Sequence, residues 1–466
     1  MIYEQMFNQQ PDKVVRAGII GLGNFATAVF AQSQCMRRLS VPVIADANLN
    51  AALEACQQAG ISKQNTSICE SRSNALRAME EGKLVILSDS SLMMDLPVDI
   101  VVEATGDPEM GVHHGLEAIR HGKHIAMVNK ETDAIVGPIL KHQADQAGVV
   151  YTAVDGDQHG LLIGLISWAR ELGLDVLCAG KARDSGILLD PATGSVIKKG
   201  ERVDIKDPHL FQLVTPSNVS AKIMHRREAL GTLANIDSFD IEELTIVANA
   251  TGLVPDIPEL HAPVVRTTEI PQVLCPAEEG GILSKRGVID MVTCIHHYGE
   301  PGLGGGVFIV VSCANDYSRR ILTGKGLISN ESGRSALIYR PYHLCGVETS
   351  ISILCAVLLG ISTAPVDYVP RFDVVLRALV NFKAGDCNEW SRYPGVSHSR
   401  KFKALMQPGK SISPGEPLPM QMLAGNILAK DVKVGQIITT DMVIEPRDSV
   451  LWSLRAQQEK HFLENS

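Results

Sequence analysis

The chain has 466 residues, of which 45% are hydrophobic and 20% charged, and its formal net charge is −9 at pH 7. This composition is that of a globular protein long enough for two or three domains, and it gives no electrostatic reason to expect nucleic acid or an anionic membrane as a partner. No apolar run approaches the roughly 20 residues of a membrane helix, and the polar start lacks a secretory signal pattern. The 10 cysteines occur singly, which favours a reduced cytoplasm over a zinc or disulfide framework.

The first predicted element is a buried strand at 14–20, which runs into a Gly-x-Gly-x-x-Ala turn and then a helix from Thr27 to about Arg38. The first glycine suits a tight turn, the second lets backbone approach a pyrophosphate, and the alanine allows close helix packing. The N–H groups at the helix start would face the anion. We therefore predict a dinucleotide site rather than a plain turn, with the residues Gly21, Gly23, Asn24, Phe25 and Ala26.

The choice between NAD and NADP rests on two later residues. The strand predicted at 41–45 ends at Asp46, which lies 25 residues after Gly21. An acidic residue there normally binds the adenosine ribose and repels a 2′-phosphate, which favours NAD. Arg72 could accommodate the extra phosphate of NADP, or it could be a solvent-exposed residue at the start of the helix predicted at 73–81.

Polar side chains follow two further predicted strands. The segment 99–106, DIVVEATG, ends in Ala104, Thr105 and Gly106, and after a helix at 108–121 the strand starting at His124 runs into Asn129 and Lys130. The carboxyl edge of an open α/β sheet is where cofactor and substrate meet. The alternative is that this asparagine and lysine are only turn and helix-cap residues, but their position downstream of the glycine loop favours a site.

A last strand of this domain, at 149–154, leads into Asp155, Asp157 and His159. Two carboxylates two residues apart, with a histidine nearby, could hold Mg²⁺ or Mn²⁺ or position a proton donor. Equally, the aspartates could cap the helix predicted at 161–172.

These motifs resemble known families. The glycine loop, the DIVVEATG strand and the GKHIAMVNK segment are similar to the nucleotide-binding domain of homoserine dehydrogenases, where Thr-Gly and Asn-Lys border the nicotinamide. The runs at 122–132 and 154–159 resemble the Asn-Lys-Glu and Val-Asp-Ser-Glu-His segments of deoxyxylulose-phosphate reductoisomerases. Over nearly the full chain, the sequence resembles the reductoisomerase-like oxidoreductases, which add a catalytic domain of their own and a C-terminal SAF domain.

The resemblance implies an activity and several roles. Some members convert 1-deoxy-D-xylulose 5-phosphate to 2-C-methyl-D-erythritol 4-phosphate with NADPH, a step towards isoprenoid precursors, while others are called homoserine dehydrogenases. Lys130 matches a lysine beside nicotinamide and substrate, and Asp155 matches the first metal carboxylate. Asp157 stands where the pattern has glutamate, so it is one methylene shorter, and His159 completes the catalytic set. A homodimer is also implied.

The middle of the chain offers candidate substrate ligands. Lys181 and Arg183 end the strand predicted at 176–183 and would give a phosphate two cationic partners. A helix is predicted at 239–252, and the glycine-rich run 298–308 could be a mobile flap or a hairpin loop. A cluster ahead of the helix at 351–359 would suit a phosphate or a hydroxyl-rich substrate, or could be structural; its residues are Arg340, His343 and Glu348.

The C-terminal part is predicted as a separate module, in which 428–439 forms a small β-clip hairpin and 451–462 a helix. We therefore predict an α/β protein with a Rossmann domain at 1–155, a mixed α/β catalytic and dimerisation domain at 156–400, and a SAF-like module at 401–466. The predicted function is NAD(P)H-dependent reductive isomerisation of a phosphorylated sugar. The alternatives are a homoserine-dehydrogenase-like enzyme acting on a small hydroxy or amino acid, and a nucleotide-sensing binding protein.

Overall fold

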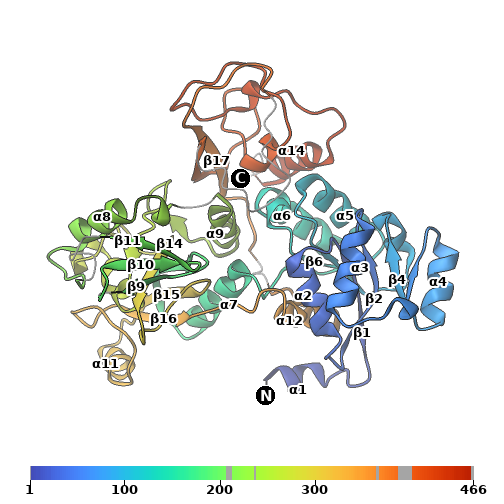
Figure 1. Ribbon diagram of the computed structural model, residues 1–466, viewed down its shortest axis with the longest axis horizontal. Helices are drawn as coiled ribbons and strands as arrows, with labels where there is room; N and C mark the ends of the chain where they lie inside the picture. The colour runs from blue at the N-terminus through green and yellow to red at the C-terminus, as the bar shows by residue number, and fades with distance from the viewer. Residues whose placement is uncertain are drawn as a thin grey trace. The chain divides into compact units, whose positions relative to one another are not determined.

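The computed structural model describes residues 2–190, 192–205, 212–235, 238–363, 367–386 and 401–462. These residues form two compact units, drawn in Figure 1. Unit 1 holds the described residues of 1–160, 344–396 and 408–466, and unit 2 holds those of 161–343 and 397–407. The first boundary lies close to the predicted one. Of the predicted C-terminal module, the described residues of 408–466 belong to the same unit as the nucleotide-binding fold, and 401–407 belong to unit 2.

Unit 1 is built on a seven-stranded parallel sheet with the strand order β3-β4-β2-β1-β5-β6-β7. The order reverses between β1 and β5, which makes their carboxyl ends the switch point of a doubly wound fold. The predicted α/β class and the predicted strands are confirmed, and the strand bounds are Val15–Ile20 (β1), Leu39–Ala45 (β2), Thr66–Ile68 (β3), Leu84–Leu87 (β4), Ile100–Glu103 (β5), His124–Met127 (β6) and Tyr151–Ala153 (β7).

Helices follow the strands of this sheet, as parallel strands require crossovers. The helix after the glycine loop, α2, begins at Asn24, earlier than predicted, because Gly23 is its N-cap. The helices of unit 1 are Ile2–Phe7 (α1), Asn24–Ser33 (α2), Leu49–Gln58 (α3), Arg72–Glu80 (α4), Pro108–Arg120 (α5), Lys130–Gln146 (α6), Thr349–Leu354 (α12), Met420–Leu423 (α13) and Val450–Phe462 (α14). Helix α7, Gln158–Glu171, leads from unit 1 into unit 2.

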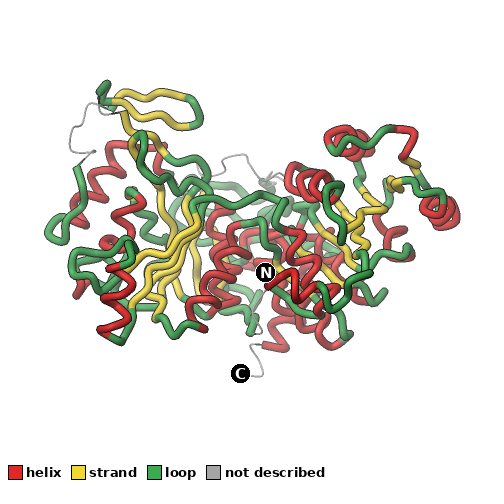
Figure 2. The backbone as a smooth tube through the Cα atoms, turned by 90° about the horizontal axis from the view of Figure 1, so that it is seen from below, coloured by secondary structure: helices red, strands yellow, loops and turns green. Residues whose placement is uncertain are grey.

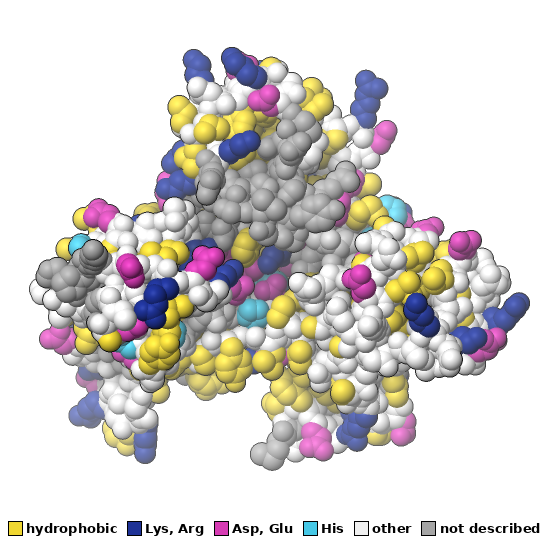
Figure 3. Space-filling view, in the orientation of Figure 1, with side chains coloured by type: hydrophobic (Ala, Val, Ile, Leu, Met, Phe, Trp, Pro, Cys, Tyr) yellow, Lys and Arg dark blue, Asp and Glu magenta, His cyan; other side chains and the backbone are white. Residues whose placement is uncertain are grey.

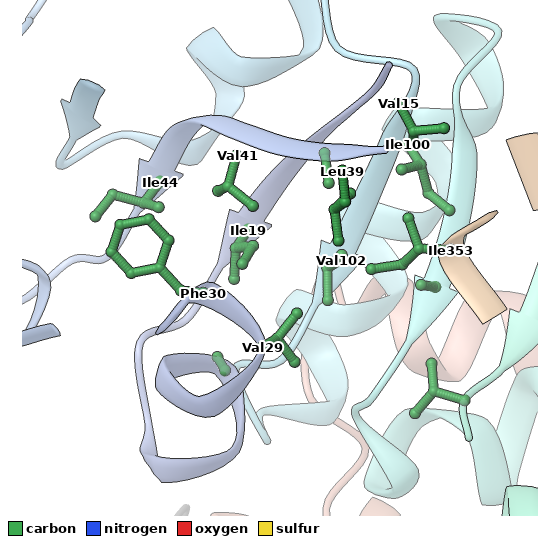
Figure 4. Packing of buried hydrophobic residues seen from close by; sticks show 14 of the residues in the cluster. Val15, Ile19, Val29, Phe30, Leu39, Val41, Ile44, Ile100, Val102 and Ile353 are labelled. Atoms are coloured by element: carbon green, nitrogen blue, oxygen red, sulfur yellow. The ribbon is translucent and has the colours of Figure 1, made fainter. Parts of the chain in front are cut away.

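The core of unit 1 is mainly aliphatic. Its side chains come from segments that are far apart in the chain. Figure 4 shows Val29 and Phe30 of α2 pointing at the β-branched side chains of the sheet, with Ile353 of α12 beside them. Ile353 is fully buried in this cluster. Burying such a side chain contributes about 1.5–3 kcal/mol, which attaches the segment after residue 344 to the nucleotide-binding fold.

The terminal helix α14, predicted at 451–462 and confirmed, lies against α5 and α6 (Figure 1). Helix α6 contains Pro138, and the Ile139 amide donates to the side chain of Gln458. The amide nitrogen of the same Gln458 donates to the carbonyl of Ile135 at 2.7 Å. One side chain of α14 thus contacts the backbone of α6 on either side of Pro138, a residue that has no N–H to donate within the helix.

Unit 2 contains a mixed sheet of nine strands. Its main path is β11-β10-β9-β14-β8-β15-β16, and β12 and β13 pair with β14. The long strands run side by side in Figure 2. The strands are Asp175–Ala182 (β8), Ile187–Asp190 (β9), Ser195–Lys198 (β10), Glu201–Asp204 (β11), Val254–Pro255 (β12), Val264–Val265 (β13), Val288–His297 (β14), Val307–Ser312 (β15) and Ala336–Arg340 (β16), and the helices are Val219–Leu230 (α8), Ser238–Thr251 (α9), Ile270–Val273 (α10) and Asp316–Gly324 (α11).

The glycine-rich run at 298–308 does not close a hairpin, contrary to one of its two predicted interpretations. The strands on either side of it, β14 and β15, both pair with β8 and lie on opposite sides of it. A Cβ on Gly304 would lie 2.4 Å from the Gly186 nitrogen, and one on Gly306 would lie 2.3 Å from the Arg340 carbonyl oxygen. The glycines let this backbone pass between two other segments.

The predicted hairpin at 428–439 is also not formed. Gly435 has φ +89 and makes the expected turn, but Val432 bridges to Phe382, and Ile437 bridges to Arg377. The bridge partners of this segment lie outside it, before it at Arg377, Phe382 and Pro417 and after it at Val443. The SAF-like identity of this region stays a prediction. The remaining strands are Phe372–Ala378 (β17), in unit 1, and Phe402–Pro408 (β18).

On the face shown in Figure 3, lysines and arginines are scattered among acidic side chains. None of the helices in the described ranges combines the length and the apolarity that crossing a bilayer requires.

Candidate active site

The glycine loop follows β1 as predicted. Gly21 has φ +86, and a Cβ placed on it would lie 2.7 Å from the carbonyl oxygen of Ala104. By contrast, a Cβ placed on Gly23, the N-cap of α2, would meet no atom within 4 Å. The first glycine is therefore needed by the fold, whereas the second leaves open space in front of a helix N-terminus. Such a space fits the phosphates of a dinucleotide.

The two glycines make a matched pair for mutagenesis. We expect Gly23→Ala to leave the free energy of unfolding within about 0.5 kcal/mol of wild type and to weaken dinucleotide binding about tenfold or more, because the methyl group occupies the space left for phosphate. Gly21→Ala should lower the free energy of unfolding by about 1–3 kcal/mol, owing to its positive φ and its clash with Ala104. For both variants, urea unfolding measures the free energy of unfolding and fluorescence titration measures the affinity for the dinucleotide. Equal dinucleotide affinity of Gly23→Ala and wild type would contradict the assignment.

Asp46 lies at the end of β2, next to the glycine loop. Its carboxylate accepts hydrogen bonds from the backbone N–H of Leu22 at 2.7 Å and of Asn48 at 2.8 Å. It therefore holds the loop, and its predicted contact with ribose stays a prediction. Arg72 is exposed at the start of α4, which follows β3. Asp46 follows β2 and Arg72 follows β3. Because β4 lies between these two strands, β2 and β3 are about 10 Å apart.

The carboxyl ends of β5 and β6 are tied together by side chains, as the sequence predicted. The Asn129 amide donates to the Thr105 hydroxyl at 3.2 Å and to the Asp107 carbonyl at 2.8 Å, and its oxygen accepts from the Thr132 N–H. Asn129 is thus both the N-cap of α6 and the link between two strand ends. The predicted cofactor residues Ala104, Thr105, Gly106 and Asn129 form one continuous ledge beside the glycine loop.

Lys130 opens α6 on this ledge. Its ammonium lies 3.9 Å from a carboxylate oxygen of Asp157, and both side chains are mostly buried. The same oxygen of Asp157 lies 3.8 Å from Nδ1 of His159, which is fully buried. The structure therefore brings together three of the four predicted catalytic residues. A carboxylate this close to an ammonium favours its charged form.

Asp155, the fourth, has different neighbours. Its backbone N–H donates to Ser352, its carbonyl accepts from Thr349, and its charge adds to burial in raising the pKa of the Cys355 thiol to about 11. No group of three or more His, Cys, Asp or Glu residues within the described ranges is arranged to hold a metal ion. Hard divalent cations need several oxygen ligands, and an ammonium lies next to Asp157. Binding of Mg²⁺ or Mn²⁺ by Asp155 and Asp157 stays a prediction.

A buried polar cluster lies in the same unit and was missed by sequence reasoning. Asp133 on α6 is fully buried, and its Oδ1 accepts hydrogen bonds from the hydroxyls of Tyr151 at 2.7 Å and Tyr368 at 2.9 Å. Gly137 makes this possible, since a Cβ there would lie 2.0 Å from the same oxygen. Burial raises the pKa of Asp133, although the nearby His159 and the two tyrosines oppose the shift.

The raised pKa of Asp133 predicts a pH-dependent stability. A carboxyl whose pKa is higher in the folded than in the unfolded state contributes its full stability below the unfolded pKa, about 3.9, and loses it as the pH rises through the folded pKa. Asp133→Asn keeps an acceptor for both tyrosines and removes the titration. Its free energy of unfolding relative to wild type should therefore increase from pH 5 to pH 8 in urea titrations. A difference that stays constant would show that Asp133 is not protonated.

In unit 2, Lys181 lies near the end of β8 and Arg183 directly follows this strand, and both lie beside acidic residues of α9. The buried Lys181 ammonium pairs with Asp240 at 2.8 Å and with Glu243, and Nε of Arg183 lies 3.6 Å from Asp240. Two cations thus face two carboxylates, and phosphate binding by Lys181 and Arg183 stays a prediction. These acidic partners lie on the helix predicted at 239–252. Residues 240–250 of this helix are buried, and buried charges are paired.

The remaining predicted substrate ligands fall into both units. In unit 2, Nδ1 of His343 lies 2.6 Å from the carbonyl oxygen of Gly305, and the Arg340 guanidinium lies over the ring of Tyr342 at 5.4 Å. In unit 1, Glu348 accepts a hydrogen bond from the Leu344 N–H at 2.9 Å and precedes α12. Their roles towards a substrate stay predictions.

Comparison with known proteins supports oxidoreductase chemistry for part of the chain. Residues 237–349, which include α9, match the family model described as "Oxidoreductase DRL, catalytic domain". A 1-deoxy-D-xylulose 5-phosphate reductoisomerase from Nitrosomonas eutropha is 25% identical over 264 residues, which cover 55% of this chain. The chain spans 60% of the length of that relative.

Solved structures with a likeness to the chain include NAD-bound proteins. GenD2 from gentamicin A biosynthesis, in complex with NAD, is 12% identical, with a TM-score of 0.36 over 77% of this chain and 89% of that one. An oxidoreductase from Agrobacterium radiobacter, in complex with NAD+, L-tartaric acid and magnesium, is 16% identical, with a TM-score of 0.27 over 47% of this chain and 55% of that one. At these scores the likenesses carry no argument about this chain's activity.

Proposed function

We propose that the chain is an NAD(P)H-dependent oxidoreductase acting on a small phosphorylated ketose. The observation that carries the proposal is the ledge of unit 1, where an open glycine loop, the Thr105–Asn129 hydrogen bond and the Lys130 ammonium lie along one sheet edge. The match of 237–349 to an oxidoreductase catalytic domain supports the reaction class. The reductoisomerase relative supports the choice of 1-deoxy-D-xylulose 5-phosphate as substrate.

The residues of the ledge have distinct tasks in this proposal. A bound nicotinamide dinucleotide supplies the hydride. Lys130 faces the carbonyl oxygen of the substrate, stabilises the negative charge that develops there and provides the proton. Asp157, 3.9 Å from the ammonium, keeps Lys130 charged and oriented. No step of this proposal passes through a metal ion.

The test is oxidation of NADPH and NADH, followed by absorbance, with purified protein and 1-deoxy-D-xylulose 5-phosphate. Parallel assays contain Mg²⁺, Mn²⁺ or a chelator, and a further one replaces the ketose with homoserine and oxidised cofactor. Turnover of the ketose supports the proposal. Loss of that turnover on chelation would support the predicted metal site at Asp155 and Asp157, and turnover that survives chelation would contradict it. Turnover of homoserine alone would replace the substrate class. Cofactor binding without turnover of either substrate would favour a nucleotide sensor.

A further inference from the structure

A chain of hydrogen bonds leads from the ledge into the interior of unit 1. Glu103, the last residue of β5, is fully buried, and its Oε1 accepts from the Thr105 hydroxyl at 2.6 Å and lies 3.1 Å from Nδ1 of His114. Nε2 of the buried His114 lies 2.7 Å from the hydroxyl of Ser90, which follows β4. On the other side, the Thr105 hydroxyl accepts from Asn129. Five side chains from four segments are thus joined end to end.

The donors and acceptors of this network fix one another. A carboxylate only accepts, so Nδ1 of His114 donates to Glu103, and in the neutral imidazole Nε2 then accepts from the Ser90 hydroxyl. For the same reason the Thr105 hydroxyl donates to Glu103 and keeps its lone pairs for Asn129 and for the Asp107 N–H, 3.3 Å away. The rotation of the Thr105 hydroxyl and the orientation of the Asn129 amide are therefore both set by the charge on Glu103.

The position of the network connects it with one half of the cofactor. The glycine loop follows β1, whereas Thr105 and Asn129 follow β5 and β6, on the other side of the switch point. A dinucleotide lies across such a switch point. With its adenosine half on the side of β2, its nicotinamide half meets the ends of β5 and β6. One oxygen of Glu103, buried at this edge, has no hydrogen-bond partner among the described residues, so the carboxylate is held from one side only.

We propose that Glu103, oriented by His114 and Ser90, is a positioning residue for the nicotinamide half of the cofactor, which it controls through Thr105 and Asn129. This inference rests on the proposed function. It predicts that loss of the carboxylate weakens the full dinucleotide selectively, because the glycine loop, which binds the ADP half, makes no hydrogen bond to Glu103 other than through the strand backbone. A merely structural role would weaken both halves equally.

The experiment compares full cofactors with their ADP halves in full-length protein. Dissociation constants are measured by calorimetry for NADH and ADP-ribose, and for NADPH and 2′-phospho-ADP-ribose. For Glu103→Met we expect the dissociation constant of the dinucleotide to rise about tenfold or more, as for loss of a charged hydrogen-bond partner. The constant for the ADP half should stay within about twofold. Glu103→Gln, which retains an acceptor, should restore part of the difference, and Ser90→Ala at the outer end should cause a smaller loss.

A matched control comes from the opposite end of the same strand. Asp99 precedes β5, and its carboxylate pairs with Lys13 at 2.7 Å; Asp99→Asn should change neither dissociation constant. A second readout is the fluorescence of bound NADPH, whose enhancement should fall in Glu103→Met. Equal weakening of both ligands, or no weakening of either, would overturn the inference. If wild-type protein binds neither the dinucleotide nor its ADP half, the proposed function itself fails.

Discussion

Replacing Arg455 with methionine is expected to lower the free energy of unfolding by about 3–5 kcal/mol, since removing one partner of a buried ion pair leaves an uncompensated charge. Arg455 on α14 is almost completely buried. Its guanidinium binds both carboxylate oxygens of Asp373 at 2.7 Å, and its Nε donates to Glu459 at 2.9 Å. Methionine fills the space of the aliphatic stem but leaves both carboxylates without their cation.

Urea unfolding measured by circular dichroism would test this effect. Arg447→Met, at an exposed position just before α14, is the control and should stay within about 0.5 kcal/mol of wild type. Because the partners are in contact, the effects should not add: Arg455→Met combined with Asp373→Leu should be less destabilised than the sum of the single variants. A loss below about 1 kcal/mol in Arg455→Met would mean that the pair is solvated and contributes as a surface pair does.

The second large effect is expected at Lys130. Lys130→Met should lower kcat for the proposed ketose by about 10²–10³-fold, the usual consequence of removing one group that stabilises an oxyanion. The dissociation constant of NADPH should change less than about threefold, because the glycine loop, not Lys130, binds the phosphates. The side chain is mostly buried next to Asp157, so the variant also removes the ammonium beside that carboxylate.

Lys141 provides the control on the same helix, where its ammonium pairs with Asp145 at 2.7 Å. Lys141→Met should retain wild-type kcat, which separates the loss of a lysine on α6 from the loss of the lysine at its first position. Steady-state kinetics and a cofactor titration on both variants are sufficient. Wild-type turnover by Lys130→Met would remove it from the chemistry and return it to the role of a helix-cap residue.

Local patterns in the sequence were sufficient for the nucleotide-binding fold. The glycine loop, the DIVVEATG strand and the Asn129–Lys130 pair could each be placed at a strand end, and parallel strands bring such ends to one edge. That reasoning uses only short-range periodicity and one topological rule, so it identified Thr105 and Asn129 as neighbours before any contact was known. It also predicted β8, α9 and α14 within a few residues.

Only the tertiary structure decided which segments that are distant in the chain pair with one another. Asp133 and Lys181 pair with side chains from other segments of the chain. The described residues of 344–396 and 408–466 belong to unit 1, where Gln458 contacts the backbone of α6. The strands at either end of the glycine run are separated by β8, which precedes both. These pairings are decided by two requirements: each buried charge needs an opposite charge beside it, and each buried backbone N–H or C=O needs a hydrogen-bond partner. These are long-range conditions that local sequence patterns do not contain.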